Sequence, residues 1–528
     1  MVMNRIPPSI FNDVIGPVMR GPSSSHTAAS VRIAKMAASM LGQPVRRALF
    51  EFDPGGSLAT TYDGQGTALG LAAGFLGLDM KDERMKDALR IAKEQGVHLD
   101  FVVTEYENDH PNTYKMTLWG PDGKGLHLTA LSTGGGMIEF TRFDGYAISS
   151  RGDYHEAFVF AANPGREDRR ALAGRLESEP SLDVFEIQVK GQDMMLNLKS
   201  SSGPCHPLVE SLGSFLTIGR VYFSEPVLPV LSRKEISVPF LNAAEALAFQ
   251  PTGWKEPWEA AAWYESQRSG KDVQEVVGMM QEIVSVMEAS IQAGLKGTAY
   301  KDRLLGQQSH LMGIAMEQDR LIPAGLMNKV VAATMAMMEV KSSLGLIVAA
   351  PTAGSCATLP GVLLTTGKEL GLDPVGISKG MLVAGLVGVF IAEKSTFAAE
   401  LAGCQAECGA ATGMAAAGLV QLAGGTLKQS FDAASMALQN IFGLACDPVA
   451  NRVEVPCLGK NIMAAVNALT AANMALAGVD AVLPLDEVIS AMDRTGRSLP
   501  FEIRCTGYGG LSITPTAKKL EEGLRQKE

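Results

Sequence analysis

The chain has 528 residues, of which 46% are hydrophobic and 19% are charged. This length exceeds what one hydrophobic core usually organises, and this composition excludes a disordered chain. The formal net charge of −10 argues against a general nucleic-acid-binding surface, because such surfaces are basic. A multidomain protein with large buried cores and no nucleic-acid partner is therefore expected.

The first region, residues 1–150, mixes short apolar runs with glycine-rich turns. Ala48–Phe52 and Phe101–Thr104 have the composition of strands, whereas Ala28–Leu41 and Ala68–Leu78 have the pattern of helices. This alternation of strands and helices predicts an α/β domain.

The second region, residues 151–200, predicts a smaller unit. A strand is expected at Ala157–Ala161, a helix at Glu167–Leu176, and two further strands at Val184–Val189 and Met194–Leu198. The order β-α-β-β is typical of small-ligand or dimerisation modules, and a structural spacer fits the same pattern.

The composition and hydrophobic pattern change twice in the remainder of the chain. Residues 201–255 are rich in serine and proline and predict a linker. From residue 256 to residue 528 the pattern is helical, as in Val273–Ala293, and predicts an all-α domain. The most apolar stretch, Met381–Ala392, has twelve residues, which is too short to span a bilayer and predicts a buried helix without a membrane partner.

Cysteine usage and the start of the chain bear on the compartment. No apolar targeting segment opens the sequence, so a cytoplasmic location is expected. In that reducing environment the seven cysteines are expected as thiols or metal ligands rather than as disulfides.

The first candidate site is Gly21–Thr27, which reads GPSSSHT and precedes a predicted helix. Serine or threonine at a helix start caps free amides, which also attract anions such as a carboxylate. His26 adds a group that transfers protons near neutral pH. An ordinary serine-rich cap with a surface histidine accounts for the pattern equally well.

Other loops carry weaker signals. The glycines of Asp53–Thr67 permit close approach of the backbone to a ligand, although a surface turn fits them better. His110-Pro111-Asn112 and Gly134–Gly136 are also weak signals when taken alone. Gly354 lies in a loop whose backbone is a candidate ligand-binding site. Arg504 lies in a glycine-rich loop, where its guanidinium is suited to pair with a substrate carboxylate.

Three separated cysteines in the helical region give the strongest chemical signal. Cys404, Cys446 and Cys457 suit three irons of a cubane cluster whose fourth iron stays open. Inert buried cysteines are the more frequent explanation of such spacing, and a zinc site is the third alternative.

Taken together, these segments resemble the bacterial iron–sulfur-dependent L-serine dehydratases (L-serine ammonia-lyases), with β and α domains fused in one chain. The resemblance covers nearly the whole chain in order. The motifs that carry it are Gly21–Thr27, Ser57–Thr67, His110–Asn112, Gly134–Gly136, Ala350–Ser355, the surroundings of Cys404, Cys446 and Cys457, and Thr506–Thr516.

The resemblance implies a multidomain fold with an N-terminal α/β domain, a small ACT-like unit and an all-α catalytic domain. It also implies a lyase that converts L-serine to pyruvate and ammonia with a [4Fe-4S] cluster, acting on a small-molecule substrate as a homo-oligomer, most simply a dimer. The implied catalytic residues are His26 and His110, with His26 as the base, and the implied cluster ligands are Cys404, Cys446 and Cys457. The implied substrate-binding residues are Ser24, Ser25, Thr27, Ser57, Asn112, Thr352, Gly354 and Arg504.

The sequence departs from the family pattern at three places. Gln65 stands where the family has a histidine, Cys505 stands where it has a glutamate, and Lys394 stands where it has small neutral residues. A Lys394 ammonium facing the site would favour a substrate with a second carboxylate. The more frequent alternative is that Lys394 points to solvent or pairs with Glu393 or Glu400. A lyase for another small hydroxy or amino acid, and a non-catalytic amino-acid sensor, therefore stay open as alternatives.

Overall fold

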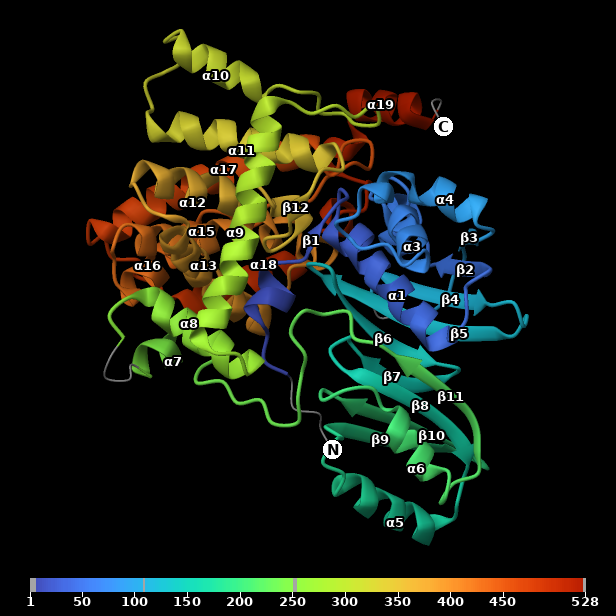
Figure 1. Ribbon diagram of the computed structural model, residues 1–528. Helices are drawn as coiled ribbons and strands as arrows, with labels where there is room; N and C mark the ends of the chain where they lie inside the picture. Colours follow the sequence, from blue (N-terminus) through green and yellow to red (C-terminus); the bar gives the residue numbers. More distant parts are fainter. Residues whose placement is uncertain (1–5, 108–109, 250–253, 526–528) are drawn as a thin grey trace.

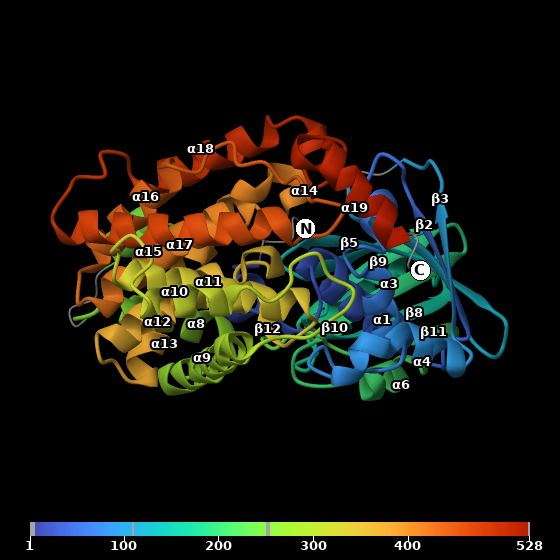
Figure 2. The same cartoon turned by 90° about the horizontal axis from the view of Figure 1, so that it is seen from above.

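The computed structural model describes residues 6–107, 110–249 and 254–525. A sheet-containing N-terminal part lies beside a helical C-terminal part (Figure 1). The same two parts lie side by side when seen from above (Figure 2). The predicted division into an α/β region and a helical region is therefore confirmed.

A six-stranded sheet organises the first region, with the strand order β3-β2-β4-β5-β6-β7. β2 and β3 run parallel and the other neighbours run antiparallel. Apolar side chains of α1 and of the sheet share one core, which includes Ile33, Phe50 and Tyr114. The elements are α1 (Ala29–Leu41), β2 (Arg47–Phe52), α3 (Thr67–Phe75), α4 (Ala88–Glu94), β3 (His98–Val103), β4 (Thr113–Trp119), β5 (Gly125–Gly134), β6 (Met137–Phe143) and β7 (Tyr146–Ser150).

A four-stranded antiparallel sheet follows, with the order β11-β8-β10-β9. Phe143 of β6 stacks on Phe158 of β8, with ring centroids 4.7 Å apart, so the two sheets pack on each other. The elements are β8 (His155–Ala162), α5 (Arg166–Glu177), β9 (Val184–Lys190), β10 (Asp193–Ser200), α6 (His206–Leu212) and β11 (Ile218–Ser224).

The predicted linker is wrong for residues 206–224, because α6 and β11 lie there and β11 pairs with β8. Val221 and Phe223 pack against the core under α5 and α6, whereas Tyr222 packs against the core of the first sheet. The prolines that suggested a linker lie mainly after the strand. The expected β-α-β-β order is present and continues as β-α-β-β-α-β.

The helical region is built around α15, every residue of which is buried. Its alanines and glycines let α12, α13, α16 and α17 pack closely around it. The helices are α7 (Ala243–Ala248), α8 (Pro257–Ser269), α9 (Val273–Lys296), α10 (Ser309–Glu317), α11 (Leu326–Ser342), α12 (Thr358–Glu369), α13 (Pro374–Lys394), α14 (Ala399–Ala402), α15 (Cys408–Leu422), α16 (Leu427–Gln439), α17 (Val455–Leu476), α18 (Leu485–Arg497) and α19 (Pro515–Arg525).

Among the described residues, α13 is the one helix that is long and apolar enough to cross a membrane. Its 21 residues extend the twelve-residue apolar run that the sequence singles out, and 78% of its most apolar window is buried inside the protein. This burial agrees with the prediction that the apolar run forms a buried helix.

The N-terminal segment does not stay with the α/β region. Ile10 and Val14, in a single helical turn (Ile10–Val14), are buried in the core of the helical region. Ser9 Oγ and the Ile10 amide donate hydrogen bonds to the Glu265 carboxylate, each 2.7 Å long. Strand β1 (Val18–Met19) then pairs with β12 (Ile347–Val348). The expected assignment of residues 1–150 to one domain is therefore wrong for this segment, because its apolar side chains complete the other core.

Glycines on α13 make room for this segment. A Cβ atom on Gly388 would lie 2.1 Å from Val14 Cγ1, closer than any real contact. We expect Gly388→Ala to cost about 1–3 kcal/mol through overpacking and to lower the thermal unfolding midpoint. Gly278 on α9 faces open space, so Gly278→Ala is the matched control and is expected to leave the midpoint unchanged or raise it. Equal midpoints for the two variants would contradict this close packing.

Candidate active site

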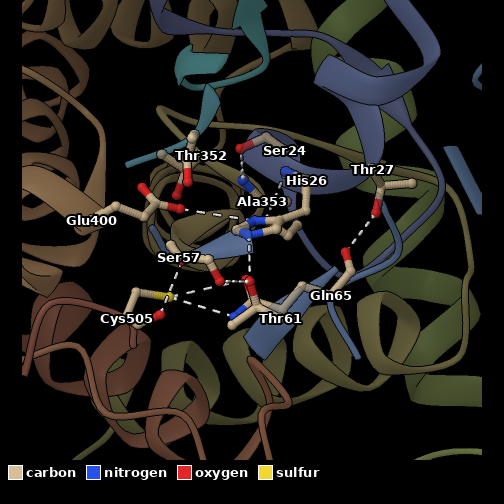
Figure 3. Close-up of polar contacts among 12 residues, drawn as sticks. Ser24, His26, Thr27, Ser57, Thr61, Gln65, Thr352, Ala353, Glu400 and Cys505 are labelled. Carbon is tan, nitrogen blue, oxygen red and sulfur yellow. Dashed lines mark hydrogen bonds and ion pairs between the residues drawn. The ribbon is translucent and has the colours of Figure 1, made fainter. Parts of the chain in front are cut away.

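Loops of the N-terminal region meet loops of the helical region at one buried junction (Figure 3). The Ala353 amide donates a hydrogen bond to Ser24 Oγ over 3.1 Å. Ser57 Oγ donates to the Cys505 carbonyl over 3.2 Å. These two bonds join four of the sequence motifs, which are far apart along the chain.

His26 lies at the centre of this junction and is fully buried. Its Nδ1 is 3.1 Å from Ser23 Oγ, and its Nε2 is 2.8 Å from Thr61 Oγ1. Thr61 Oγ1 donates its proton to the Ser57 carbonyl, which assigns the imidazole proton to Nε2. Burial lowers the pKa of His26 to about 3, so the ring is neutral around pH 7.

Glu400 of α14 approaches the same imidazole, with Oε1 3.8 Å from His26 Nδ1. Its side chain is only 3% exposed. Burial, together with the negative charge of Glu407, raises the pKa of Glu400 to about 7. Its second oxygen, Oε2, has no hydrogen-bond partner among the described residues.

Asn112 is a second unsatisfied group near this carboxylate. It is fully buried, and neither atom of its amide has a hydrogen-bond partner within the described part of the chain. Asn112 nevertheless lies near enough to Glu400 to lower the pKa of that carboxyl slightly. The Asn112 backbone amide donates to His110 Nδ1 over 3.1 Å, and burial lowers the pKa of His110 to about 4. His110 therefore shapes the turn that presents Asn112.

The loop before α12 adds a second buried carboxylate. Thr352 Oγ1 donates to Glu407 Oε1 over 2.6 Å. A Cβ atom on Gly354 would lie 2.6 Å from the same oxygen, so only glycine permits this approach. Burial raises the pKa of Glu407. The absence of a side chain at Gly354 thus lets the Glu407 carboxylate pack directly against the backbone.

All three predicted ligand cysteines are buried near one another. Cys404 and Cys446 belong to one buried cluster that also contains Cys408 and Cys505. Cys457 lies in the first turn of α17, where burial raises its pKa and the nearby Cys404 raises it further. Cys404 lies in a short turn (Cys404–Ala406) ahead of α15, so it does not share one helix with Cys408 as its spacing suggests.

The donor set suits an iron–sulfur cluster. Thiols are its usual ligands, and here they come from three separate segments into a buried, cation-flanked space. The Lys460 ammonium, bonded to Asp447 Oδ1 over 2.7 Å, is the neighbouring cation, and its pKa is raised by Cys404 and Cys446. Among the described residues, no group of three His, Cys, Asp or Glu side chains converges on a single metal ion. A cubane differs from such a site because each ligand binds a separate iron.

Two of the departures from the family pattern contact each other. Gln65 Nε2 donates to Cys505 Sγ over 3.5 Å, and Thr27 Oγ1 donates to the Gln65 carbonyl over 3.0 Å (Figure 3). Residues 65 and 505 are 440 positions apart, so the sequence alone gives no sign of this contact. The histidine and glutamate of the family pattern are thus replaced by two side chains that satisfy each other.

The remaining predicted residues divide into two groups. Ser25 is buried in the same turn as His26 and Ser24, and Arg504 Nη1 donates to the Leu401 carbonyl over 3.2 Å at the end of α14. Lys394 lies elsewhere: its Nζ is 3.3 Å from Asp486 Oδ1, and its side chain is 30% exposed. The hypothesis that Lys394 faces the site is therefore wrong, and its partner is Asp486 rather than Glu393 or Glu400.

The sequence analysis missed several groups that the structure places at the junction. Thr61, Glu400, Glu407 and Lys460 all contact the predicted residues or their neighbours. One signal for the two glutamates is their position in the segment 398–408, which is otherwise small and apolar. Charged residues in such surroundings are costly unless they are paired or used.

Comparisons with known proteins find relatives for both regions of the chain. Residues 242–512 match the family model of the serine dehydratase alpha chain. The chain is 39% identical over 260 residues to the probable L-serine dehydratase alpha chain of Bacillus subtilis (strain 168), covering 49% of this chain and 87% of that relative. It is 43% identical over 186 residues to the probable beta chain of the same organism, covering 35% of this chain and 82% of that relative. It is 27% identical over 417 residues to the L-serine dehydratase of Streptomyces coelicolor, covering 76% and 85%.

Proposed function

Because the chain belongs to the L-serine dehydratase family, we propose that it removes water from L-serine and releases pyruvate and ammonia. The observation that carries this proposal is the junction itself. Buried thiols, a buried carboxylate and an unsatisfied amide gather there from both regions of the chain. Unsatisfied buried polar atoms are costly, and a polar substrate would supply their missing partners.

Cys404, Cys446 and Cys457 would hold a [4Fe-4S] cluster at this junction. When bound, the cluster supplies an iron that acts as a Lewis acid toward the substrate's carboxylate and β-hydroxyl. Lys460 would offset the negative charge of the thiolates, because its ammonium lies beside Cys404 and Cys446. This ligand set rests on the donor chemistry and on the motifs.

The polar residues around the cysteines would bind and orient the amino acid. The Asn112 amide, which lies near Glu400 and has no hydrogen bond of normal geometry to any described residue, has a donor and an acceptor for the substrate. His26 and His110 would act as positioning residues, since burial keeps both rings neutral and each has a hydrogen-bond partner. Further substrate-contacting residues in this proposal are Ser24, Ser25, Thr27, Ser57, Thr352, Gly354 and Arg504.

The reaction begins with loss of the α-proton and of the β-hydroxyl. The electron pair of the Cα–H bond forms a double bond between Cα and Cβ, and the hydroxyl leaves as water. The resulting enamine rearranges to an imine, which a water molecule hydrolyses to pyruvate and ammonia. The buried junction keeps bulk water away until the elimination is complete.

A second candidate is elimination from another small β-substituted amino acid. The observation that favours it is the Gln65–Cys505 contact, because it replaces a histidine and a glutamate with an amide and a thiol. The shape and polarity of this corner of the site therefore differ from those implied by the family pattern.

One experiment separates these candidates. The protein is purified without oxygen, its iron and acid-labile sulfide are measured, and a panel of small β-substituted amino acids is assayed for release of ammonia and 2-oxo acid. Iron and sulfide in equal amounts, with L-serine as the best substrate, support the proposal. A different best substrate favours the second candidate, and a cluster-free protein without lyase activity rejects both.

Lys394 gives a further test of substrate choice. Its ammonium pairs with Asp486 at the surface, so we expect it to bind no second carboxylate of a substrate. We expect Lys394→Met to leave the KM for L-serine unchanged and to leave any weak turnover of β-hydroxyaspartate equally unaffected. Steady-state kinetics with both substrates check this result. A selective rise in KM for the dicarboxylate would return Lys394 to the site.

A further inference from the structure

We propose that Glu400 is the catalytic residue that accepts the α-proton of the substrate. The inference rests on the proposed function, because it assigns a role within that elimination.

Glu400 has an oxygen available for a ligand in a place where unsatisfied oxygens are rare. Its side chain is 3% exposed, and Oε2 has no hydrogen-bond partner in the described ranges. Buried carboxylates normally accept two or more hydrogen bonds, because an unpaired buried charge is strongly penalised. Glu400 Oε2 is therefore able to accept a proton or a hydrogen bond from the substrate.

Asn112, whose amide is near enough to the Glu400 carboxyl to lower its pKa, is also without a hydrogen bond of normal geometry. Asn112 is fully buried, and both atoms of its amide lack partners among the residues described. Glu400 comes from the helical region and Asn112 from the N-terminal region, so the two groups approach the junction from opposite sides. A substrate that accepts a hydrogen bond from the Asn112 amide would thus lie beside Glu400 Oε2.

The nearest alternative base is less suited to the task. Both ring nitrogens of His26 are engaged, with Ser23 and Thr61, and burial lowers its pKa to about 3. Burial raises the pKa of Glu400 to about 7, which is close to the value that favours proton transfer at neutral pH. Glu400 is therefore the stronger base of the two.

The charged and titratable groups around Glu400 support this assignment. Glu407 raises its pKa, whereas Asp493 and Arg497 of the neighbouring α18 pair with each other. The groups that face Glu400 or the short helix α14 from the packed elements include His26, Tyr114, Glu407, Arg504 and the thiols that cluster with Ala399, which are Cys404, Cys408, Cys446 and Cys505. Among them Arg504 is the one cation, and it donates to a backbone carbonyl rather than to Glu400.

The proton balance of the step is simple. The ionised Glu400 carboxylate takes the α-proton while the Cα–H electron pair forms the new double bond. The Cβ–O bond breaks, and the departing hydroxide takes up the proton that Glu400 removed from Cα, so it leaves as water. Glu400 is then ionised again, and the enzyme ends in the state in which it began.

Glu400→Gln tests the proposal because the amide keeps the shape of the side chain but accepts no proton. We expect kcat for L-serine to fall by about 10²–10⁴-fold. The iron and sulfide content should match that of the wild-type enzyme. The thermal unfolding midpoint should be equal or higher, because the variant no longer buries a titratable carboxyl group. Glu369→Gln is the matched control, since Glu369 is exposed and pairs with Lys329 at the surface; it should keep wild-type turnover.

Glu400→Asp separates proton transfer from a structural role. It keeps a carboxylate but draws it back by one methylene, so transfer of the α-proton should become more rate-limiting. We expect a larger isotope effect on kcat with serine deuterated at Cα than the wild-type enzyme shows. A lower kcat with an unchanged isotope effect would overturn the assignment, because it would indicate a structural role.

The two proposals fail in different ways. Active wild-type enzyme together with an equally active Glu400→Gln variant would overturn the role of Glu400 alone. Loss of the cluster in Glu400→Gln would also overturn it, because the residue would then support the cofactor instead. Wild-type enzyme that holds a cluster but releases no 2-oxo acid from L-serine would overturn the proposed function, and the Glu400 assignment with it.

Discussion

Replacing Cys404, Cys446 or Cys457 with alanine is expected to abolish both the visible charge-transfer absorbance of the protein and its turnover of L-serine. Each thiol would bind a separate iron, so loss of one leaves a corner of the cluster without a protein ligand. The absorbance spectrum and the iron and sulfide content of anaerobically purified variants check this prediction. Exposure of the wild-type enzyme to air is expected to inactivate it for the same reason, because an open iron is readily lost.

The other cysteines provide the controls. Cys205 lies in the four-stranded sheet region, where its thiol is bonded to the His155 carbonyl, so Cys205→Ala should keep cluster and activity. Cys408 and Cys505 belong to the same buried cluster as Cys404 and Cys446. Alanine at either position should retain the cluster if the three motif cysteines are the ligands. An intact cluster in Cys446→Ala, or its loss in Cys505→Ala, would contradict this ligand set.

Replacing His26 with asparagine is expected to lower kcat by about 10²-fold, because the ring bonds Thr61 and packs beside Glu400, and small displacements of reacting groups are costly. The pH dependence near neutrality should persist in this variant. Glu400 becomes protonated as the pH falls through about 7, so turnover falls toward acid. The imidazole, whose pKa is lowered to about 3, stays neutral over this range.

Rate–pH profiles of the wild-type and variant enzymes check this prediction. His127→Asn is the matched control, because His127 is exposed on β5 and bonded to Thr117. It should keep both the rate and the profile. Disappearance of the acidic limb in His26→Asn would identify the imidazole as the titrating base and would remove that role from Glu400.

Local patterns made much of the fold predictable. The periodicity of Ala28–Leu41 predicts α1 to within one residue, and the apolar run Ala48–Phe52 predicts β2 equally well. Strand β11 was missed because nearby prolines resemble a linker and its partner, β8, lies about 60 residues earlier in the chain. Pairing over such a separation leaves no local trace.

Contacts between distant parts of the chain also made the candidate site only partly predictable. Motifs pointed to His26, Asn112 and the cysteines because each lies in a recognisable short segment. The Gln65–Cys505 contact and the approach of Glu400 to His26 depend on tertiary packing across the two regions. Burial lowers the pKa of His26 and raises that of Glu400, and the local sequence around either residue does not reveal how deeply it is buried.

The N-terminal segment has a consequence for how the chain is made. Val18 pairs with Val348, which the ribosome adds 330 residues later. At about 5–20 residues per second, this segment waits on the order of tens of seconds before its partner strand is made. During that interval the apolar side chains of Ile10 and Val14 have no helical core to enter. The nascent chain therefore exposes an apolar segment until the helical region has been synthesised, and such a segment suits chaperones that act at the ribosome.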